Sequence, residues 1–181
     1  MLPPHASFAP FTTPRLALVA LRLEHAPAVF AYANDPDIGR MVGWPRHETL
    51  ADSRRFVARC QVGYAKGDLY QWGLLRRSDR AFLGTCGFGT LDRARGVGEI
   101  DYVLAKPFWR LGFATEAAAA VLHFGFTALG LRLIEARAWP NNTASLRVIA
   151  KLGLRYRETE SVDTPAEMPQ TVSVFQIERR Q

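Results

Sequence analysis

The sequence predicts a single α/β (α+β) domain with one central, mixed but mostly antiparallel sheet, flanked by about four helices. Three observations lead to this prediction. The chain has 181 residues, which suits one domain with a continuous core. The predicted elements follow one another in the order β-α-α-β-β-β-α-β-α-β-β, so helices and strands interleave. Two of the connections between strands are too short to hold a helix, and they indicate antiparallel hairpins.

The composition indicates an ordinary folded protein. Hydrophobic residues make up 48% and charged residues 22% of the chain, which excludes wholesale disorder. The net charge of +6 favours attraction of anions such as phosphates. Its arginines are scattered rather than clustered, so direct binding to nucleic acid is not expected. The two cysteines, Cys60 and Cys86, lack the spacing of a disulfide framework or of a metal site, and no metal is expected.

Residues 1–12 are rich in proline and predict a flexible leader, which places the domain at residues 13–181. The leader lacks the charged start and apolar core of a signal peptide. The longest apolar stretch is far shorter than the ~20 residues that span a bilayer. We therefore expect a cytoplasmic protein with no membrane association.

The first half of the domain predicts a strand, two helices and three strands. The first helix has Ala26, Val29 and Ala33 on one face and stops at the sequence "NDPD". The second helix begins with Thr49 and Asp52, whose spacing resembles a capping box. Alternating apolar residues predict the strands, at residues 15–21, 69–77, 81–91 and 96–105.

The second half predicts two helices, each followed by strand structure. An apolar helix is expected from about Ala114 to Ala128, and a strand at 131–139. Asn142 is a plausible N-cap for the next helix, which ends at Gly153. Strands at residues 154–162 and 171–179 complete the order.

The turn before the helix at Ala114 is a candidate anion site. A glycine-containing turn at a helix N-terminus presents unpaired N–H groups and the positive end of the helix dipole. Gly112 would let the backbone approach a ligand closely, Thr115 would add a hydroxyl, and Arg110 would add a charge. A glycine that only joins a strand to a helix gives the same pattern, so the turn alone leaves both interpretations open.

The surrounding motifs resemble the GNAT superfamily of acetyl-CoA-dependent N-acetyltransferases, and most closely its RimJ/RimL-like branch. The motifs are "TPRLAL", "GEIDYVLAKPFWRLGFATEA" and "NNTASLRVIAKLGLRY", in that order, and the resemblance spans residues 13–179. It implies a sheet that is splayed in the middle. It also implies transfer of an acetyl group from acetyl-CoA to a primary amine, by direct attack on the thioester. The amine would belong to a protein N-terminus or to a small molecule.

The resemblance assigns the coenzyme pyrophosphate to one loop: Trp109, Arg110, Leu111, Gly112, Phe113, Ala114 and Thr115. Two positions depart from the branch. Arg110 stands where a second glycine is usual, so its backbone must adopt a conformation that glycine adopts more easily. Leu111 stands where a basic residue is usual. These departures motivate the alternative of a non-catalytic acyl-CoA-binding module on the same fold.

The resemblance also assigns groups around the thioester. Glu99 to Leu104 would splay from the next strand at a bulge, and N–H groups near Val103 and Leu104 would bind the acetyl carbonyl. Tyr102 belongs to the same cofactor-binding set. Asn142 would lie beside the pantetheine arm, and the Ser145 hydroxyl would hydrogen-bond or protonate the departing thiolate.

Glu99 and Asp101 are the candidate general bases, because strand alternation places both on one face. Each could equally be a solvent-facing charge. An α-amine is about one-fifth neutral near pH 7.2, whereas a lysine amine is neutral in about one molecule per thousand. With no strong base evident, the sequence favours an α-amine or another low-pKa amine. Monomer and homodimer both stay open.

The acceptor is expected to contact the first two helices and the last hairpin. Four residues lie in suitable segments: Trp44, His47, Trp72 and Glu167. His47 is interpreted as a loop histidine, and aromatic residues at such positions are more often core than recognition.

Overall fold

The computed structural model describes residues 8–163 and 171–179. These residues form one eight-stranded sheet with five α-helices and two short 3-10 helices. The strands are β1 (Phe11–Thr12), β2 (Leu16–Ala20), β3 (Tyr70–Arg76), β4 (Phe82–Asp92), β5 (Val97–Leu104), β6 (Leu133–Ala138), β7 (Arg155–Ser161) and β8 (Thr171–Glu178). The helices are α1 (Ala26–Ala33), α2 (Pro36–Val42), α3 (Leu50–Lys66), α4 (Phe113–Thr127) and α5 (Thr143–Lys151).

The strand order in the sheet is β1-β2-β3-β4-β5-β6-β8-β7. Every neighbouring pair is antiparallel except β5 and β6, which run parallel. The helix α4 connects these two strands, as a parallel crossover requires. The predicted mixed, mostly antiparallel α/β sheet is therefore confirmed.

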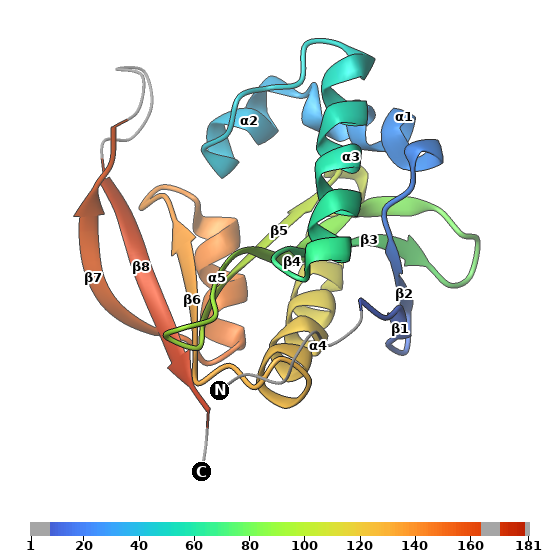
Figure 1. The fold of residues 1–181 in the computed structure, drawn as a ribbon. Coiled ribbons are helices and arrows are strands. Elements are labelled where there is room, and N and C mark those ends of the chain that lie inside the picture. The colour runs from blue at the N-terminus through green and yellow to red at the C-terminus, as the bar shows by residue number, and fades with distance from the viewer. Residues whose placement is uncertain (1–7, 164–170, 180–181) are drawn as a thin grey trace.

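The sheet is splayed between β5 and β6. These strands pair only where Val97 to Glu99 lie beside Leu133 to Glu135, and the rest of β5 pairs on its other edge, with β4. Figure 1 shows the two strands adjacent at one end and diverging toward the other. The expected splay is confirmed.

Two packed cores lie on opposite faces of the sheet. The larger core packs α4 against the sheet, with Phe88, Ile100 and Ala117 among its members. The smaller core is formed by α1 and α3, through Val29, Val57 and other residues, and Val103 of β5 packs against it. Alternation along β5 therefore turns Ile100 toward α4 and Val103 toward α1 and α3.

The sequence prediction missed the helix α2. The "NDPD" segment does end α1, but Asp35 also caps a new helix by accepting a 2.9 Å hydrogen bond from the Asp37 amide, with Pro36 in the first turn. Gly43 ends that helix in a left-handed conformation, with φ of 73°. The described residues thus contain five α-helices, where about four were expected.

The folded part of the chain also begins earlier than residue 13. Phe8 stacks on Tyr64 with ring centroids 3.9 Å apart, and Phe11 belongs to β1, which pairs with β2. The Trp72 indole donates a 3.0 Å hydrogen bond to the Ala9 carbonyl. The end of the expected leader is therefore packed against the domain, while residues 1–7 lie outside the described residues.

Candidate active site

The loop before α4 adopts the conformation that its sequence requires. Gly112 is left-handed, with φ of 81°, and so is Arg110, with φ of 61°. The expectation that Arg110 must adopt a backbone more natural to glycine is confirmed. The Glu116 amide donates to the Gly112 carbonyl at 3.0 Å, which closes the first helical turn.

The amides of Phe113, Ala114 and Thr115 precede that first helical hydrogen bond. No hydrogen-bond partner is found for them among the residues that the structure describes. Together with the positive end of the α4 dipole, they form a cradle suited to an anion. These residues belong to the loop that the resemblance assigned to the coenzyme pyrophosphate.

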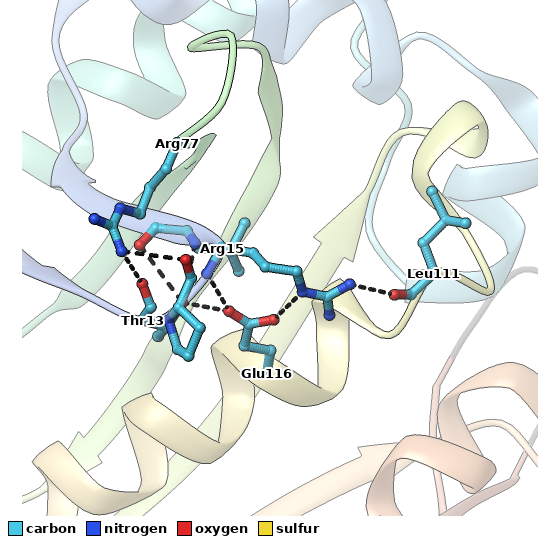
Figure 2. Close-up of polar contacts among 7 residues, drawn as sticks. Thr13, Arg15, Arg77, Leu111 and Glu116 are labelled. Atoms are coloured by element: carbon cyan, nitrogen blue, oxygen red, sulfur yellow. Dashed lines mark hydrogen bonds and ion pairs between the residues drawn. The ribbon is translucent and has the colours of Figure 1, made fainter.

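Arg15 holds this loop from the side, a role that the sequence analysis missed (Figure 2). Its Nη1 donates a 3.0 Å hydrogen bond to the Leu111 carbonyl, and its Nε contacts Glu116 Oε2 at 2.6 Å. Its guanidinium also lies 4.4 Å from the centre of the Phe113 ring. A methyl group built on Gly112 would lie 3.4 Å from Arg15 Nη2, so the guanidinium lies directly beside the loop.

Glu116 ties the first turn of α4 to the segment just before β2. Its Oε1 accepts hydrogen bonds from the Thr13 hydroxyl at 2.6 Å and from the Arg15 amide at 2.9 Å. Burial alone would raise the pKa of Glu116, but these hydrogen bonds and the Arg15 charge outweigh it and hold the pKa below its usual value. The "TPRL" and "ATEA" motifs, which carried the family resemblance separately, therefore meet in one polar contact.

The free edge of β5 presents backbone groups to the splay. Ala105 N donates to Leu83 O on β4 at 2.9 Å, so strand alternation turns the Leu104 N–H toward the β6 side. The Leu104 carbonyl, on that same edge, accepts a 2.6 Å hydrogen bond from Trp109 Nε1. By the same alternation the Val103 N–H faces β4. Of the two amides expected near the acetyl carbonyl, Leu104 is the one directed into the gap.

The bulge next to the segment Glu99 to Leu104 lies in β4. The register between β4 and β5 shifts between Phe88 and Thr90, so the extra residue is Gly89 of β4. The segment Glu99 to Leu104 was expected to splay from the next strand at a bulge, and the register shift lies on its other side, in the pairing with β4. Its separation from β6 instead follows from the early end of the parallel pairing.

Tyr102 and Ser145 meet across the splay. Their hydroxyl oxygens are 2.9 Å apart, and the Tyr102 hydroxyl also donates to the Ser145 carbonyl at 3.2 Å. Burial raises the pKa of Tyr102 to about 12, a rise that the hydrogen bond with Ser145 partly offsets. The two side chains therefore form a neutral hydroxyl pair between β5 and the first turn of α5.

Asn142 caps α5 as predicted. Its Oδ1 accepts a 3.0 Å hydrogen bond from the Ser145 amide, and its Nδ2 donates to the Met41 carbonyl of α2 at 3.0 Å. A cavity of about 290 Å³ opens beside these contacts. It is lined by residues of α2, of the turn before α4 and of the start of α5: Asp37, Arg40, Met41, Lys106, Trp109, Asn141 and Asn142.

The two candidate bases have different surroundings. Glu99 contacts Arg137 at 2.6 Å, and Arg137 also pairs with Glu135 and Glu160. Burial raises the pKa of Glu99, an effect that the Arg137 charge opposes. Glu99 is therefore engaged in an ion-pair network along β5 and β6.

Asp101 has no ion pair within the described residues, and its side chain is exposed. Its Oδ1 accepts a 2.7 Å hydrogen bond from Gln71 Nε2. The residue as a whole is exposed, but the protein around its carboxylate desolvates that group and raises its pKa to about 6. A carboxylate with this pKa on an exposed residue suits proton transfer near neutral pH.

The expected acceptor residues are only partly supported. Trp72 is fully buried in the larger core, which agrees with the interpretation that an aromatic residue at such a position is more often core than recognition. His47 contacts the Ser53 hydroxyl at 2.8 Å, and burial lowers its pKa, which fits a packed loop histidine. Trp44 packs beside it, with ring centroids 5.4 Å apart, and Glu167 lies outside the described residues.

Cys60 and Cys86 are free and buried. In the part of the chain that the structure describes, no three histidine, cysteine or acidic side chains gather as a metal site would require. Within the same part, every helix is too short or too polar to cross a membrane.

Comparison with known proteins identifies the family. The model of the acetyltransferase (GNAT) domain matches residues 15–155, and the chain belongs to this family. The N-acetyltransferase YoaA of Bacillus subtilis is 32% identical over 143 residues, covering 79% of this chain and 81% of YoaA. The chain is accordingly an acetyltransferase that moves an acetyl group from acetyl-CoA to an amine, as the resemblance implied.

Solved structures share the fold. RimL, a ribosomal L7/L12 α-N-protein acetyltransferase in complex with coenzyme A, aligns with a TM-score of 0.85 over 94% of this chain and 98% of its own, at 15% identity. The microcin C7 self-immunity acetyltransferase MccE, in complex with acetyl-CoA and AMP, aligns with a TM-score of 0.82 over 96% and 99%, also at 15% identity. At this identity the two likenesses show a shared fold.

Proposed function

We propose that this enzyme acetylates an α-amine or another low-pKa primary amine, with Asp101 as the general base. The observation that carries the proposal is the carboxylate of the exposed residue Asp101, whose pKa of about 6 leaves it ionised at neutral pH. Such a base can accept a proton, directly or through water, from an amine that is already partly neutral.

The coenzyme would bind along the α4 side of the splay. The amides of Phe113 to Thr115 supply donors for the diphosphate, and Arg110 and Arg15 supply positive charge beside them. The thioester arm would then pass between β5 and β6, where the Leu104 N–H is directed. That amide is fixed before the reaction begins and can stabilise the oxyanion of the tetrahedral intermediate.

The two proton-transfer groups lie on opposite faces of β5. Strand alternation turns Asp101 toward α1 and α3, whereas Tyr102 points toward Ser145. The amine nitrogen attacks the thioester carbonyl from the Asp101 side, and its proton passes to the carboxylate. As the C–S bond breaks, the coenzyme sulfur accepts a hydrogen bond, and then a proton, from the Tyr102–Ser145 pair, and solvent returns that proton.

Ser145 keeps the part that the resemblance gave it, now shared with Tyr102. Asn142 is proposed to contact the pantetheine arm while it caps α5. Glu99 is a weaker candidate for the base, because Arg137 already pairs with it. Replacing Glu99 by glutamine should therefore leave the proton transfer in place.

A pH profile of acetyl-CoA thiol release tests the assignment. Peptides with free α-amines, their lysine-only counterparts and small polyamines serve as acceptors. In the parent, kcat/KM should decline as the pH falls through about 6, and we call this decline the acid limb. We expect Asp101→Asn to abolish the acid limb and Glu99→Gln to keep it. An unchanged limb in Asp101→Asn would reject the base, and faster transfer to lysine than to α-amines would reject the acceptor class.

The non-catalytic alternative has no observation in its favour beyond the altered loop, whose Arg110 adopts the required backbone. Cytoplasmic location, the oligomeric state and the absence of nucleic-acid binding stay predictions.

A further inference from the structure

We propose that Gln71 is the positioning residue for the base, and that Gly87 and Gly89 provide the space in which it acts. The inference rests on the proposed role of Asp101. On the sheet face covered by α1 and α3, the buried side-chain amide of Gln71 reaches from β3 across β4 to Asp101 of β5.

Gln71, Gly87 and Asp101 form one row across three strands. Gln71 of β3 pairs with Gly87 of β4, which in turn pairs with Asp101 of β5. Residues that are directly opposite in a sheet project their side chains on the same face. Because Gly87 has no side chain, the Gln71 amide can pass over it and reach the Asp101 carboxylate at 2.7 Å.

The two glycines keep this passage open. A methyl group on Gly87 would lie 2.0 Å from the Tyr70 carbonyl oxygen and 2.6 Å from Gln71 Oε1, and one on Gly89 would lie 2.5 Å from Asp101 Oδ2. These distances are shorter than any ordinary carbon–oxygen contact. A larger residue at Gly89 would therefore move the carboxylate, and one at Gly87 would displace both the β3 backbone and the Gln71 amide.

The hydrogen bond from Gln71 gives the two carboxylate oxygens of Asp101 different roles. Gln71 is buried, with only 5% of its surface exposed, so its amide has little freedom to rotate away. It holds Oδ1 and leaves Oδ2, above the exposed Gly89, for the amine or its bridging water. A neutral amide fixes the direction of the carboxylate without cancelling its charge, as an arginine would.

Several titratable or charged groups, one of them on the opposite sheet face, interact electrostatically with Asp101 and could affect its titration. Among the described residues these are Glu99 on the same strand, Arg59 and Cys60 on α3, Tyr32 on α1 and Cys86 on β4. Burial raises the pKa of both thiols and of the tyrosine, so these three stay neutral across the range of the assay. Glu99 and Arg59 are the charged neighbours, and the Glu99→Gln variant separates the first from Asp101.

The experiment measures kcat/KM against pH in the full chain for Gln71→Leu and Gln71→Glu. Removing the amide donor should raise the pKa of the acid limb by about 1 unit in the leucine variant, because a hydrogen bond to a carboxylate favours its charged form. The glutamate variant adds a second negative charge and should raise it further. Both should regain most of the parent rate on the alkaline plateau.

Thr85→Val is the matched control. Thr85 is a buried polar residue like Gln71 but lies on the neighbouring strand β4, and its hydroxyl lies 3.2 Å from Tyr32 Oη. This variant should lose stability and leave the acid limb in place. If the Gln71 variants lower kcat at every pH without moving the limb, the positioning role is wrong.

Gly89→Ala tests the same geometry if the Gln71 variants fail to fold. Gly89 is exposed and has no left-handed backbone, so alanine meets only the end of the Asp101 side chain. We expect kcat to fall by roughly tenfold or more, because a small displacement of a reacting group is costly. In an Asp101→Asn background the same change should add no further loss. An equal loss in both backgrounds would overturn the inference.

The outcomes also separate this inference from the proposed function. If Asp101→Asn keeps the decline of kcat/KM at acidic pH, the assignment of Asp101 as the general base is rejected. If Asp101→Asn loses this decline but the Gln71 variants have the same pH profile as the parent, only the proposed role of Gln71 is rejected.

Discussion

Replacing Arg15 by glutamine should weaken acetyl-CoA binding without unfolding the protein. The guanidinium donates to the Leu111 carbonyl at 3.0 Å and so fixes the loop that carries the unpaired amides of α4. Its side chain is 48% exposed, so its ion pair with Glu116 should contribute at most about 1 kcal/mol to stability. Glutamine is too short and uncharged, and it cannot replace both contacts.

The loss of affinity can be estimated from the hydrogen bond and the charge. A hydrogen bond of this kind contributes about 0.5–1.5 kcal/mol, and the lost positive charge beside the diphosphate adds to it. About 1.4 kcal/mol corresponds to a tenfold rise in Kd. Isothermal titration with coenzyme A should therefore show a weakening of roughly tenfold, while acetyl-pantetheine, which lacks the diphosphate, should be processed at the parent rate.

Arg77→Gln is the control for this prediction. Arg77 Nη1 donates to the Thr13 and Pro14 carbonyls at 3.0 and 3.1 Å, so it supports the same segment and carries the same charge (Figure 2). It does not touch the loop before α4. Equal loss of affinity in the Arg15 and Arg77 variants, or equal loss for acetyl-pantetheine, would refute the reasoning.

Three further predictions follow from contacts in the site. Because the pKa of Glu116 is lower in the folded than in the unfolded protein, ionised Glu116 stabilises the fold fully above its unfolded pKa near 4.3, and this stabilisation is lost as the pH falls through its folded pKa. The melting temperature should therefore fall more steeply below about pH 4.3 in the parent than in Glu116→Gln. Parallel melting-temperature curves would contradict this. Arg110 and Arg80 both have a left-handed backbone, which glycine adopts without a Cβ clash. Replacing either by glycine should therefore raise the free energy of unfolding, measured in urea, by about 0.5–1 kcal/mol. A decrease in both variants would show that neither position is strained. Tyr102→Phe and Ser145→Ala should each lower kcat in single-turnover assays, and the double variant should be little worse than the poorer single one, since the hydroxyls act as a pair; additive losses would assign them separate roles.

Local patterns were sufficient to predict most of the elements. The capping pair of Thr49 and Asp52 forms as expected, and the helix that it begins ends at Gly67, which is left-handed. The helix α2 was missed because "NDPD" both ends one helix and begins another. The Asp-Pro pair was itself a start signal, and it would have predicted the helix had it been weighed in both directions.

The partners of the site residues were beyond sequence reasoning. Strand alternation predicts that Glu99 and Asp101 share one face of β5. It cannot predict that Glu99 pairs with Arg137 of β6, or that Asp101 accepts a hydrogen bond from Gln71 of β3. Those contacts depend on strand order and register. Arg15 and Glu116 are likewise about a hundred positions apart in the chain, and only the packing of α4 beside β2 brings them together.

The narrow contact between β5 and β6 leaves room for the proposed coenzyme arm to support the sheet. Only three residue pairs join the two halves, so the amide edge beyond Glu99 lacks a neighbouring strand. A bound coenzyme arm would fill that position and act as a temporary structural element. The melting temperature should consequently rise with coenzyme concentration, because a ligand that binds only the folded state stabilises it by mass action. In a cell, the lifetime of this protein would then follow the supply of the compound that it consumes.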